Sequence, residues 1–478
     1  VFAVERLESI DDVARRVRSA SAAAFVSPTI HSVKSTEASR GYSVRQEVEA
    51  LPQKYEAGHV VAICSHAALL MSDFTNFHGW HLVVDEVPGV LHSEEIASKC
   101  DVEFFARHYE LTPVDQKWSS VTLTDQGLAI DGSDLAMDDS HRHLRAFHQR
   151  VVEASRGGDT VRSVICNLQS WPEMAQDNLK WVWWSVFSIH QLEAFRSIKF
   201  LGNAFTQSLS YKILRKRANL QPGDNRRPVQ WKSFSKNRVR AFAKRNVHVR
   251  YFATRNAACS HFATDVGLRH RKQIGEYVAS QVAAEHMIWT CNKLKDVVAD
   301  PLFEALPATS YLRPRQAGTD AYMDRSHALI IYASKPSRNM RSVLDHLRLD
   351  DSDWVISNEY ETILQFVTRT SVRDPANAQD VTIWVYNKDQ ATYLMDYLAT
   401  LRHVTADIDL IDLGLVFEAS NPGGRPKISR TPDEAAALAQ EQRDRKARTE
   451  RERRKKLKEA RFVAGQPLRP RGRPRKAA

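Results

Sequence analysis

Short apolar stretches alternate with amphipathic ones along the first part of the chain. The apolar stretches lie at 1–4, 23–32, 59–64 and 81–86, and stretches with helical spacing lie at 9–20, 43–55 and 65–74. Ser9, with Asp12 three residues later, and Ser43 are expected to cap the first two helices. Strands that alternate with helices are typical of a parallel sheet covered on both faces.

This alternation is lost between about 92 and 198. Residues 118–134 alternate apolar and polar positions between turn residues and predict antiparallel strands, whereas 139–156 has helical spacing. The aromatic stretch 180–187 is predicted to lie in a core rather than to form a surface on which bases stack. We interpret the region as an insertion of mixed, β-containing structure.

A second alternation begins after residue 246. The predicted strands are 247–253, 286–292, 327–334 and 381–387, and the predicted helices are 271–285, 337–347, 359–369 and 390–401. The fold class is therefore α/β, with two parallel-sheet lobes, the first of which contains the insertion. The expected boundaries are 1–210 for the first lobe, 211–245 for a basic connector, 246–420 for the second lobe and 421–478 for a tail that is helical and disordered.

Composition limits the classes to which the protein can belong. The chain has 478 residues, enough for two or three domains, and 43% of them are hydrophobic. Its five cysteines form no C-x-x-C pair, which argues against a disulfide framework and favours a reducing compartment such as the cytoplasm. No apolar run is long enough to cross a membrane, so no membrane partner is expected.

The positive charge is concentrated in two segments. The formal net charge is +11, and the tail from residue 421 onward holds 19 lysines and arginines against 7 acids. Residues 212–250 hold 13 basic residues and one acid, with aromatic side chains between them. Such segments favour binding to nucleic acid, and Arg215, Lys216 and Arg217 are the candidate contacts in the second segment. The alternative is a solvated basic surface.

Two adjacent acids end the strand predicted at 81–84. Asp85 and Glu86 are followed by Pro88 and Gly89, which cannot continue a sheet. In open parallel sheets, ligands bind beyond the carboxyl ends of the strands. An acid pair there suits nucleotide hydrolysis, in which one carboxylate holds Mg²⁺ and the other activates the attacking water. The alternative is that the two acids begin a surface turn.

A polar and basic series occurs near the end of the second lobe. Gln365, Arg369 and Arg373 follow one another at intervals of four, which places them on one face of a single predicted helix. Arginines that point from one lobe at a nucleotide on the other neutralise charge in the transition state of hydrolysis. The alternative is a helix whose arginines form ordinary salt bridges.

Together these stretches resemble superfamily 2 helicases, and among them the divergent DEAD/DEAH-like helicases common in phages and prophages. Residues 83–88 resemble the Walker B box, 60–69 the strand and turn before it, 316–325 the motif that contacts both nucleotide and strand, and 365–374 the arginine-finger motif. The resemblance covers about residues 1–401 and implies two RecA-like lobes. It also implies DNA as a partner, ATP and Mg²⁺ as cofactors, and the cytoplasm, that of a bacterial host if the gene is from a phage.

The resemblance also implies a role for each matching residue. Asp85 would bind magnesium and Glu86 would activate water, with Arg369 as the better-matched finger, Arg373 as a second and Gln365 beside them. Nucleotide contacts are implied for Gly318, Thr319 and Asp320, and DNA contacts for Ser65, which stands where threonine is usual, and His66. Residues 200–208 occupy the place of the Ser-Ala-Thr coupling motif but depart from its pattern.

One motif of this family is absent from the sequence. No G-x-x-x-x-G-K-[ST], the loop that cradles phosphates, occurs anywhere in it. Two explanations remain open: the chain is truncated before its first strand and hydrolyses little ATP as it stands, or it is an ATPase scaffold that has become a DNA-binding protein.

The C-terminus contains a second candidate DNA element. Arg471 to Pro474 resembles an AT-hook, in which Arg471 and Arg473 would enter the narrow minor groove of A-tracts. A generic basic tail is the alternative.

The expected function is therefore that of an enzyme, an ATP-dependent DNA helicase or translocase. A DNA-binding protein that does not hydrolyse ATP, and a restriction- or packaging-type motor ATPase, are the alternatives.

Overall fold

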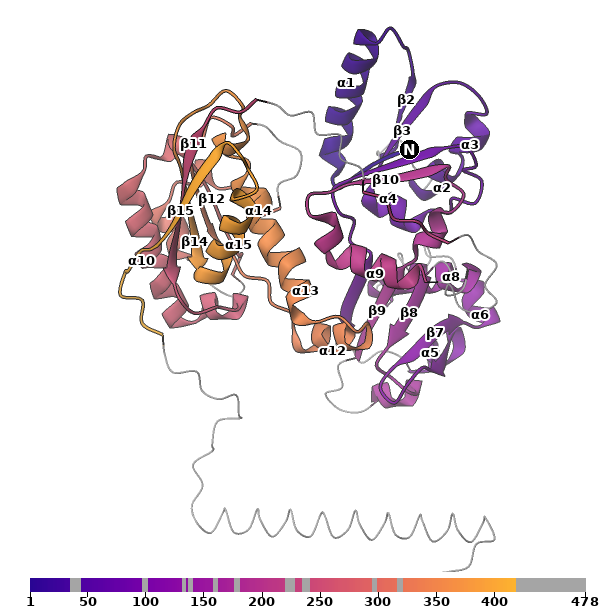
Figure 1. The fold of residues 1–478 in the computed structure, drawn as a ribbon. Helices are drawn as coiled ribbons and strands as arrows, with labels where there is room; N and C mark the ends of the chain where they lie inside the picture. Colours follow the sequence, from indigo (N-terminus) through magenta and orange to yellow (C-terminus); the bar gives the residue numbers. More distant parts are fainter. Residues whose placement is uncertain are drawn as a thin grey trace, which may run out of the picture. The chain divides into compact units, whose positions relative to one another are not determined.

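The computed structural model divides the chain after Val416, and the unit described below is Val1–Val416. It describes residues 1–34, 44–96, 102–130, 135, 141–157, 162–175, 181–219, 228–233, 241–294, 299–315 and 321–417. The first unit is α/β, with two parallel sheets and one antiparallel sheet (Figure 1). This confirms the predicted fold class at the level of its sheets.

Among the described residues, no helix combines the length and the apolar character that a membrane crossing requires.

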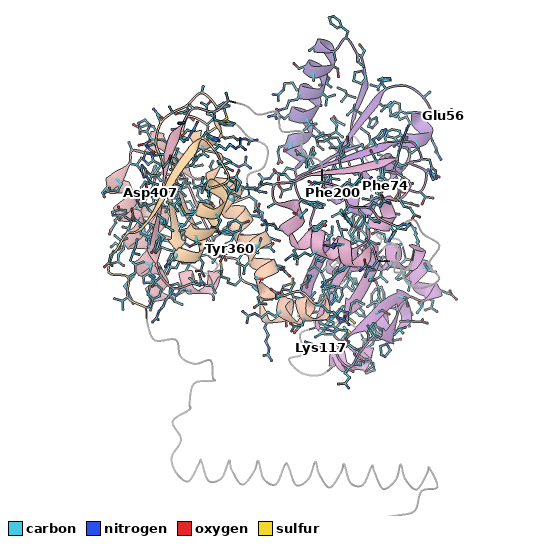
Figure 2. All side chains as sticks on the ribbon, viewed as in Figure 1. Glu56, Phe74, Lys117, Phe200, Tyr360 and Asp407 are labelled. Carbon is cyan, nitrogen blue, oxygen red and sulfur yellow. The ribbon has the colours of Figure 1, made fainter. Side chains whose placement is uncertain are left out.

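The first parallel sheet has the strand order β10-β4-β1-β3-β2. Its strands are β1 (Phe2–Val4), β2 (Thr29–Ser32), β3 (Val60–Ser65), β4 (His81–Asp85) and β10 (Ser197–Leu201). The helices between the first four strands are α1 (Leu7–Ala23), α2 (Val44–Glu49), α3 (Leu51–Lys54) and α4 (His66–Met71). Buried side chains such as Phe74 and Leu82 form the core beside the sheet (Figure 2). The alternation read from the sequence is thus confirmed.

Two details at the start of the chain differ from the prediction. Helix α1 begins at Leu7 after Arg6, which makes no side-chain cap, so Ser9 lies within the helix rather than at its cap. The predicted strand 23–32 is shorter by six residues, because the chain leaves α1 through Phe25, whose φ is 54°. Its side chain is 98% exposed. The other predicted cap, Ser43, lies outside the described residues.

The insertion forms the antiparallel sheet, with the strand order β5-β9-β8-β7-β6. Its strands are β5 (Leu91–Ile96), β6 (Tyr109–Pro113), β7 (Ser119–Leu123), β8 (Arg162–Cys166) and β9 (Trp181–Phe187), and its helices are α5 (Val102–His108), α6 (Asp125–Leu128) and α8 (Arg145–Gly157). Every residue of β9 is buried. This confirms that the aromatic stretch belongs to a core, because none of its rings is available at the surface.

The second parallel sheet has the strand order β12-β13-β14-β11-β15. Its strands are β11 (Arg245–Ala253), β12 (Met287–Cys291), β13 (His327–Ile331), β14 (Val381–Asn387) and β15 (Val404–Leu410). Its helices are α10 (Asp265–Gln281), α11 (Pro301–Ala305), α12 (Arg338–His346), α13 (Asp351–Val355), α14 (Glu361–Val367) and α15 (Lys388–Leu398). Four strands were predicted, and β15 was missed. In β15 only alternate residues are half-buried, so it lacks a continuous apolar run.

Helix α12 contributes to the core of the first sheet, although it follows β13 of the second. Val343 and Leu344 are buried in the same apolar cluster as Trp118 and Trp184 of the insertion. The ring of His346 lies 5.9 Å from that of Trp118 and 5.3 Å from that of Trp184. The insertion therefore holds a helix that belongs to the other half of the unit.

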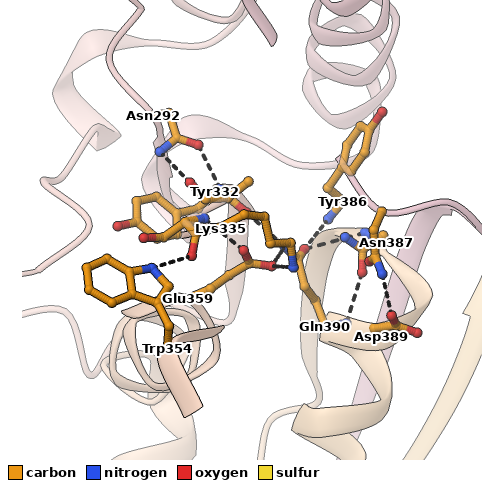
Figure 3. Close-up of polar contacts among 12 residues, drawn as sticks. Asn292, Tyr332, Lys335, Trp354, Glu359, Tyr386, Asn387, Asp389 and Gln390 are labelled. Carbon is orange, nitrogen blue, oxygen red and sulfur yellow. Dashed lines mark hydrogen bonds and ion pairs between the residues drawn. The ribbon is translucent and has the colours of Figure 1, made fainter. Parts of the chain in front are cut away.

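A buried glutamate joins the carboxyl ends of strands in the second sheet (Figure 3). Glu359, whose exposure is 0%, lies in a π-helical turn, Ile356–Tyr360, between α13 and α14. Its carboxylate accepts hydrogen bonds from the backbone N–H of Ser334 (2.7 Å), from Lys335 Nζ (3.0 Å) and from Gln390 Nε2 (2.9 Å). The same Gln390 Nε2 donates to the carbonyl oxygen of Tyr332 (2.8 Å). The network joins the end of β13 to α15 and to the helical segment that leads to Gln365.

Candidate functional site

The acid pair lies where β4 leaves the sheet. Asp85 is the last residue of the strand, and Glu86 turns the chain with a φ of 66°, in the left-handed region. A non-glycine residue there costs about 1–2 kcal/mol, and such conformations gather at functional sites. His66 Nε2 donates to the carbonyl oxygen of Asp85 (2.8 Å), and Ser65 caps α4 by accepting from the N–H of Ala68 (3.2 Å). Residues at the end of β3 and the start of α4 therefore hold the backbone of the acid pair in place.

Gln365 reaches this acid pair from α14. Its Nε2 donates to Glu86 Oε2 over 3.2 Å, across a sequence separation of 279 residues. The contact joins the carboxyl edge of the first sheet to a helix of the second. It brings one member of the predicted polar and basic series, Gln365, beside the acid pair.

The expectation that Gln365, Arg369 and Arg373 share one helix is wrong. Helix α14 ends at Val367, and Arg373 lies in a separate 3₁₀ turn, Ser371–Arg373. The β-branched Thr368 ends the helix, where its hydroxyl donates back to the carbonyl oxygen of Leu364 (2.8 Å). Both arginines nevertheless act on the acids, because the charges of Arg369 and Arg373 lower the pKa of Glu86.

Burial dominates the electrostatics of the acid pair. It raises the pKa of Glu86, and the negative charges of Asp85 and Glu5 raise it further, against the lowering by the arginines. Burial also raises the pKa of Asp85, which the charges of Arg16 and Arg373 lower. A carboxylate with a raised pKa is a stronger base, which is what activation of a water molecule requires.

Arg369 is held in the same low-dielectric environment. The residue is 4% exposed, and burial is the main cause that lowers the pKa of its guanidinium group. The nearby charge of Arg373 lowers this pKa further, whereas Glu86 raises it. The buried guanidinium group of Arg369, with the exposed Arg373 near it, forms an environment suited to an anion.

A cavity of about 360 Å³ opens beside Glu86. Its polar lining includes Glu5, His66, Glu86, Arg315, Glu361 and Gln365. Volumes of this order suit a small-molecule ligand.

Two acids beside this cavity were not predicted from the sequence. Glu5 directly follows β1, which pairs with β4 in parallel, so its position after a strand was a usable signal. Glu361 accepts from Tyr393 Oη and from Asn203 Nδ2 (3.4 Å), and burial raises its pKa. These partners come from distant parts of the sequence, so no local pattern indicated them.

Most of the residues predicted to bind DNA have contacts within the chain. Ser65 and His66 are 9% and 7% exposed, so they position the acid pair and offer little surface to a DNA strand. Lys216 Nζ donates to the carbonyl oxygens that follow α12, including that of Leu347 (2.9 Å), and an Arg217 guanidinium nitrogen donates to Ser163 Oγ (2.6 Å). Arg215 is exposed on α9 (Leu209–Arg217), as is Lys216.

Five predicted site residues lie outside the described residues. They are Gly318, Thr319 and Asp320, expected to contact nucleotide, and Arg471 and Arg473, expected to contact DNA. Their assignments remain predictions.

The described residues fit a magnesium ion better than they fit the phosphates of ATP. No group of three or more histidine, cysteine or acidic side chains within them is arranged to hold a metal ion. Magnesium bound with a nucleotide needs only one or two carboxylates, because phosphates and water complete its shell, and Asp85 and Glu86 are the residues that would supply them. Arg369 and Arg373 suit a phosphate, but the sequence contains no glycine-rich loop to cradle it.

Comparison of the sequence with protein-family models and with curated proteins found no match. The geometry of the acid pair and the residues that surround it are therefore the basis on which a function can be proposed.

Proposed function

We propose that the protein is part of a nucleoside-triphosphate-driven DNA motor, a helicase or translocase with two RecA-like halves. The observation that supports this most directly is the contact between Gln365 and Glu86. It brings an acid pair at the end of a parallel strand together with a polar and basic series from the other parallel sheet. Motors of this type hydrolyse ATP between two such halves.

Each side chain of the site would have a distinct role in ATP hydrolysis. Magnesium-bound ATP, when present, supplies the phosphoanhydride bond that is broken. Asp85 would hold the ion through its water shell, and Glu86 would orient the attacking water and accept its proton. Gln365 keeps the Glu86 carboxylate turned toward the site. Arg369 and Arg373 place positive charge where negative charge grows in the transition state.

A DNA-binding protein that does not hydrolyse ATP is the second candidate. The lack of a G-x-x-x-x-G-K-[ST] stretch in this sequence favours it, since the backbone of that loop and its lysine normally hold the phosphates. The basic segments 212–250 and 421–478 support DNA as the partner of either protein.

The test is ATP hydrolysis by the protein as its gene encodes it, measured with and without DNA. Glu86→Gln should lower turnover by about 10²- to 10⁴-fold, the range for loss of a general base, and leave nucleotide binding intact. Arg369→Ala should lower turnover by about 10³- to 10⁵-fold. Glu110→Gln, on an exposed residue of β6, is the matched control and should change nothing.

Unchanged ATP turnover in the Glu86→Gln variant would refute the proposal. DNA binding without any nucleotide hydrolysis by the wild-type protein would establish the second candidate instead.

A further inference from the structure

Four aromatic rings gather beside β10. Phe200 of that strand and Phe205 are stacked, with centroids 4.7 Å apart and planes 9° apart. Tyr211 lies 5.3 Å from Phe205, and Trp231 lies 5.0 Å from Tyr211 and 6.3 Å from Phe205. We call these four residues the aromatic cluster; Phe200 is labelled in Figure 2.

The aromatic cluster is not a closed core. All four residues are half-buried, whereas the aromatic residues of β9 are buried completely. The turn that presents Phe205 contains Ala204 in the left-handed region, with a φ of 46°. The fold thus keeps a strained turn and leaves part of four rings open to solvent.

Positive charge surrounds the aromatic cluster in the sequence. Lys232 is exposed and is next to Trp231 along the chain, and Arg215 is exposed on α9 one turn after Tyr211. The cluster also overlaps the segment 212–250, with its 13 basic residues and one acid. A partner with both flat rings and negative charge complements this surface.

We propose that the aromatic cluster is a stacking surface for the bases of single-stranded nucleic acid. The proposal rests on the proposed function, for which it names the place where a single strand is held. Bases stack on aromatic side chains with little dependence on sequence, and nearby lysines and arginines pair with the phosphates. A duplex does not fit this surface in the same way, since its bases are already stacked on one another.

The surface is directly joined to the acid pair. A side chain at Gly202 would come within 2.6 Å of Val87 Cγ2, so the turn after β10 packs against the residue that follows Glu86. Further along the chain, on α9, Ser210 Oγ donates to the carbonyl oxygen of Pro88 (2.6 Å). A strand bound at the aromatic cluster would therefore contact elements that pack against the segment after Glu86.

The experiment compares three ligands of equal length by fluorescence anisotropy: a single-stranded oligothymidylate, an abasic strand with the same phosphates, and a duplex. Phe205→Leu and Trp231→Leu keep an apolar side chain but remove the aromatic ring. Each should weaken binding of the oligothymidylate by about 5- to 100-fold, the range for loss of one stacking partner. Phe205→Tyr and Trp231→Phe should restore it.

Two further results are expected if stacking is the cause. Neither leucine variant should change binding of the abasic strand or the duplex, and the salt dependence should stay the same because every phosphate remains neutralised as before. Phe25→Leu is the matched control, since that ring is 98% exposed but lies outside the aromatic cluster, and it should bind like the wild type.

Equal binding of oligothymidylate by the wild type and both leucine variants would overturn the proposal, as would an equal weakening for the abasic strand. Neither result affects the test of Glu86→Gln, so failure of the stacking surface and failure of the proposed function are separable.

Discussion

Glu359→Ala should destabilise the protein more than most single substitutions, because it removes the acceptor of three hydrogen bonds at once. The carboxylate receives the backbone N–H of Ser334, Lys335 Nζ and Gln390 Nε2 at distances of 2.7 to 3.0 Å. An unsatisfied buried donor costs about 1–3 kcal/mol. Lys335 adds little to this cost, because its side chain is 21% exposed and can turn to water. Gln390 adds only part of it, because it keeps its hydrogen bond to the carbonyl oxygen of Tyr332.

The expected decrease in the free energy of unfolding is therefore about 2–4 kcal/mol, from one donor left unsatisfied at Ser334 and one bond of two lost at Gln390. This is a large share of the roughly 5–15 kcal/mol that stabilises a typical domain. Glu359→Gln retains one acceptor oxygen but turns an N–H toward one of the donors, so it should cost less, about 1–3 kcal/mol.

Urea titration of the two variants measures these decreases. Glu110→Ala, on the exposed side of β6, should stay within about 0.5 kcal/mol of the wild type. A decrease below about 1 kcal/mol for Glu359→Ala would refute the reasoning, because it would mean that the three donors find other partners at no cost.

Three further outcomes are expected. Burial raises the pKa of Glu86, so its ionised form is unfavourable in the folded state. Glu86→Gln should therefore be more stable than the wild type at pH 7. The difference should vanish below pH 4.5, the ordinary pKa of a glutamate. Burial lowers the pKa of His66 from 6.5 to about 4. The free energy of unfolding should therefore fall as the pH is lowered from 6.5 to about 4. His66→Gln should remove this pH dependence in acid titrations. Deletion of residues 421–478 should flatten the salt dependence of duplex binding. The slope of log K against log salt should change by about 0.9 for each phosphate that is no longer neutralised. The double variant Arg471→Ala, Arg473→Ala should selectively weaken binding of A-tract duplexes.

The sequence predicted most strands of the two parallel sheets and the place of the acid pair because both depend on local patterns. A short apolar run followed by Asp85 and Glu86 and then by Pro88 can only end a strand, and parallel strands bring their carboxyl ends to one edge. These inferences needed no knowledge of how distant segments pack. Of the series Gln365, Arg369 and Arg373, the structure joins Gln365 to that edge by a hydrogen bond, although the three do not share one helix.

What the sequence could not predict depends on contacts between distant segments and on single side chains. The left-handed turn at Glu86 has no glycine or asparagine to mark it, and α14 ends at Val367 with no glycine or proline after it to mark the end. The network around Glu359 joins side chains that lie 24 to 31 residues apart. In each case the structure around the residue overrode the local pattern.

The position of α12 in the core of the first sheet has a consequence for biosynthesis. Leu344 emerges from the ribosome roughly 160 residues after Trp184, which at 5–20 residues per second is a delay on the order of 10 to 30 seconds. During that time Trp118 and Trp184 lack part of their cover, so nascent chains that stop before α12 should expose apolar surface and attract chaperones. The first sheet and its insertion therefore complete their folding only after α12 has been translated.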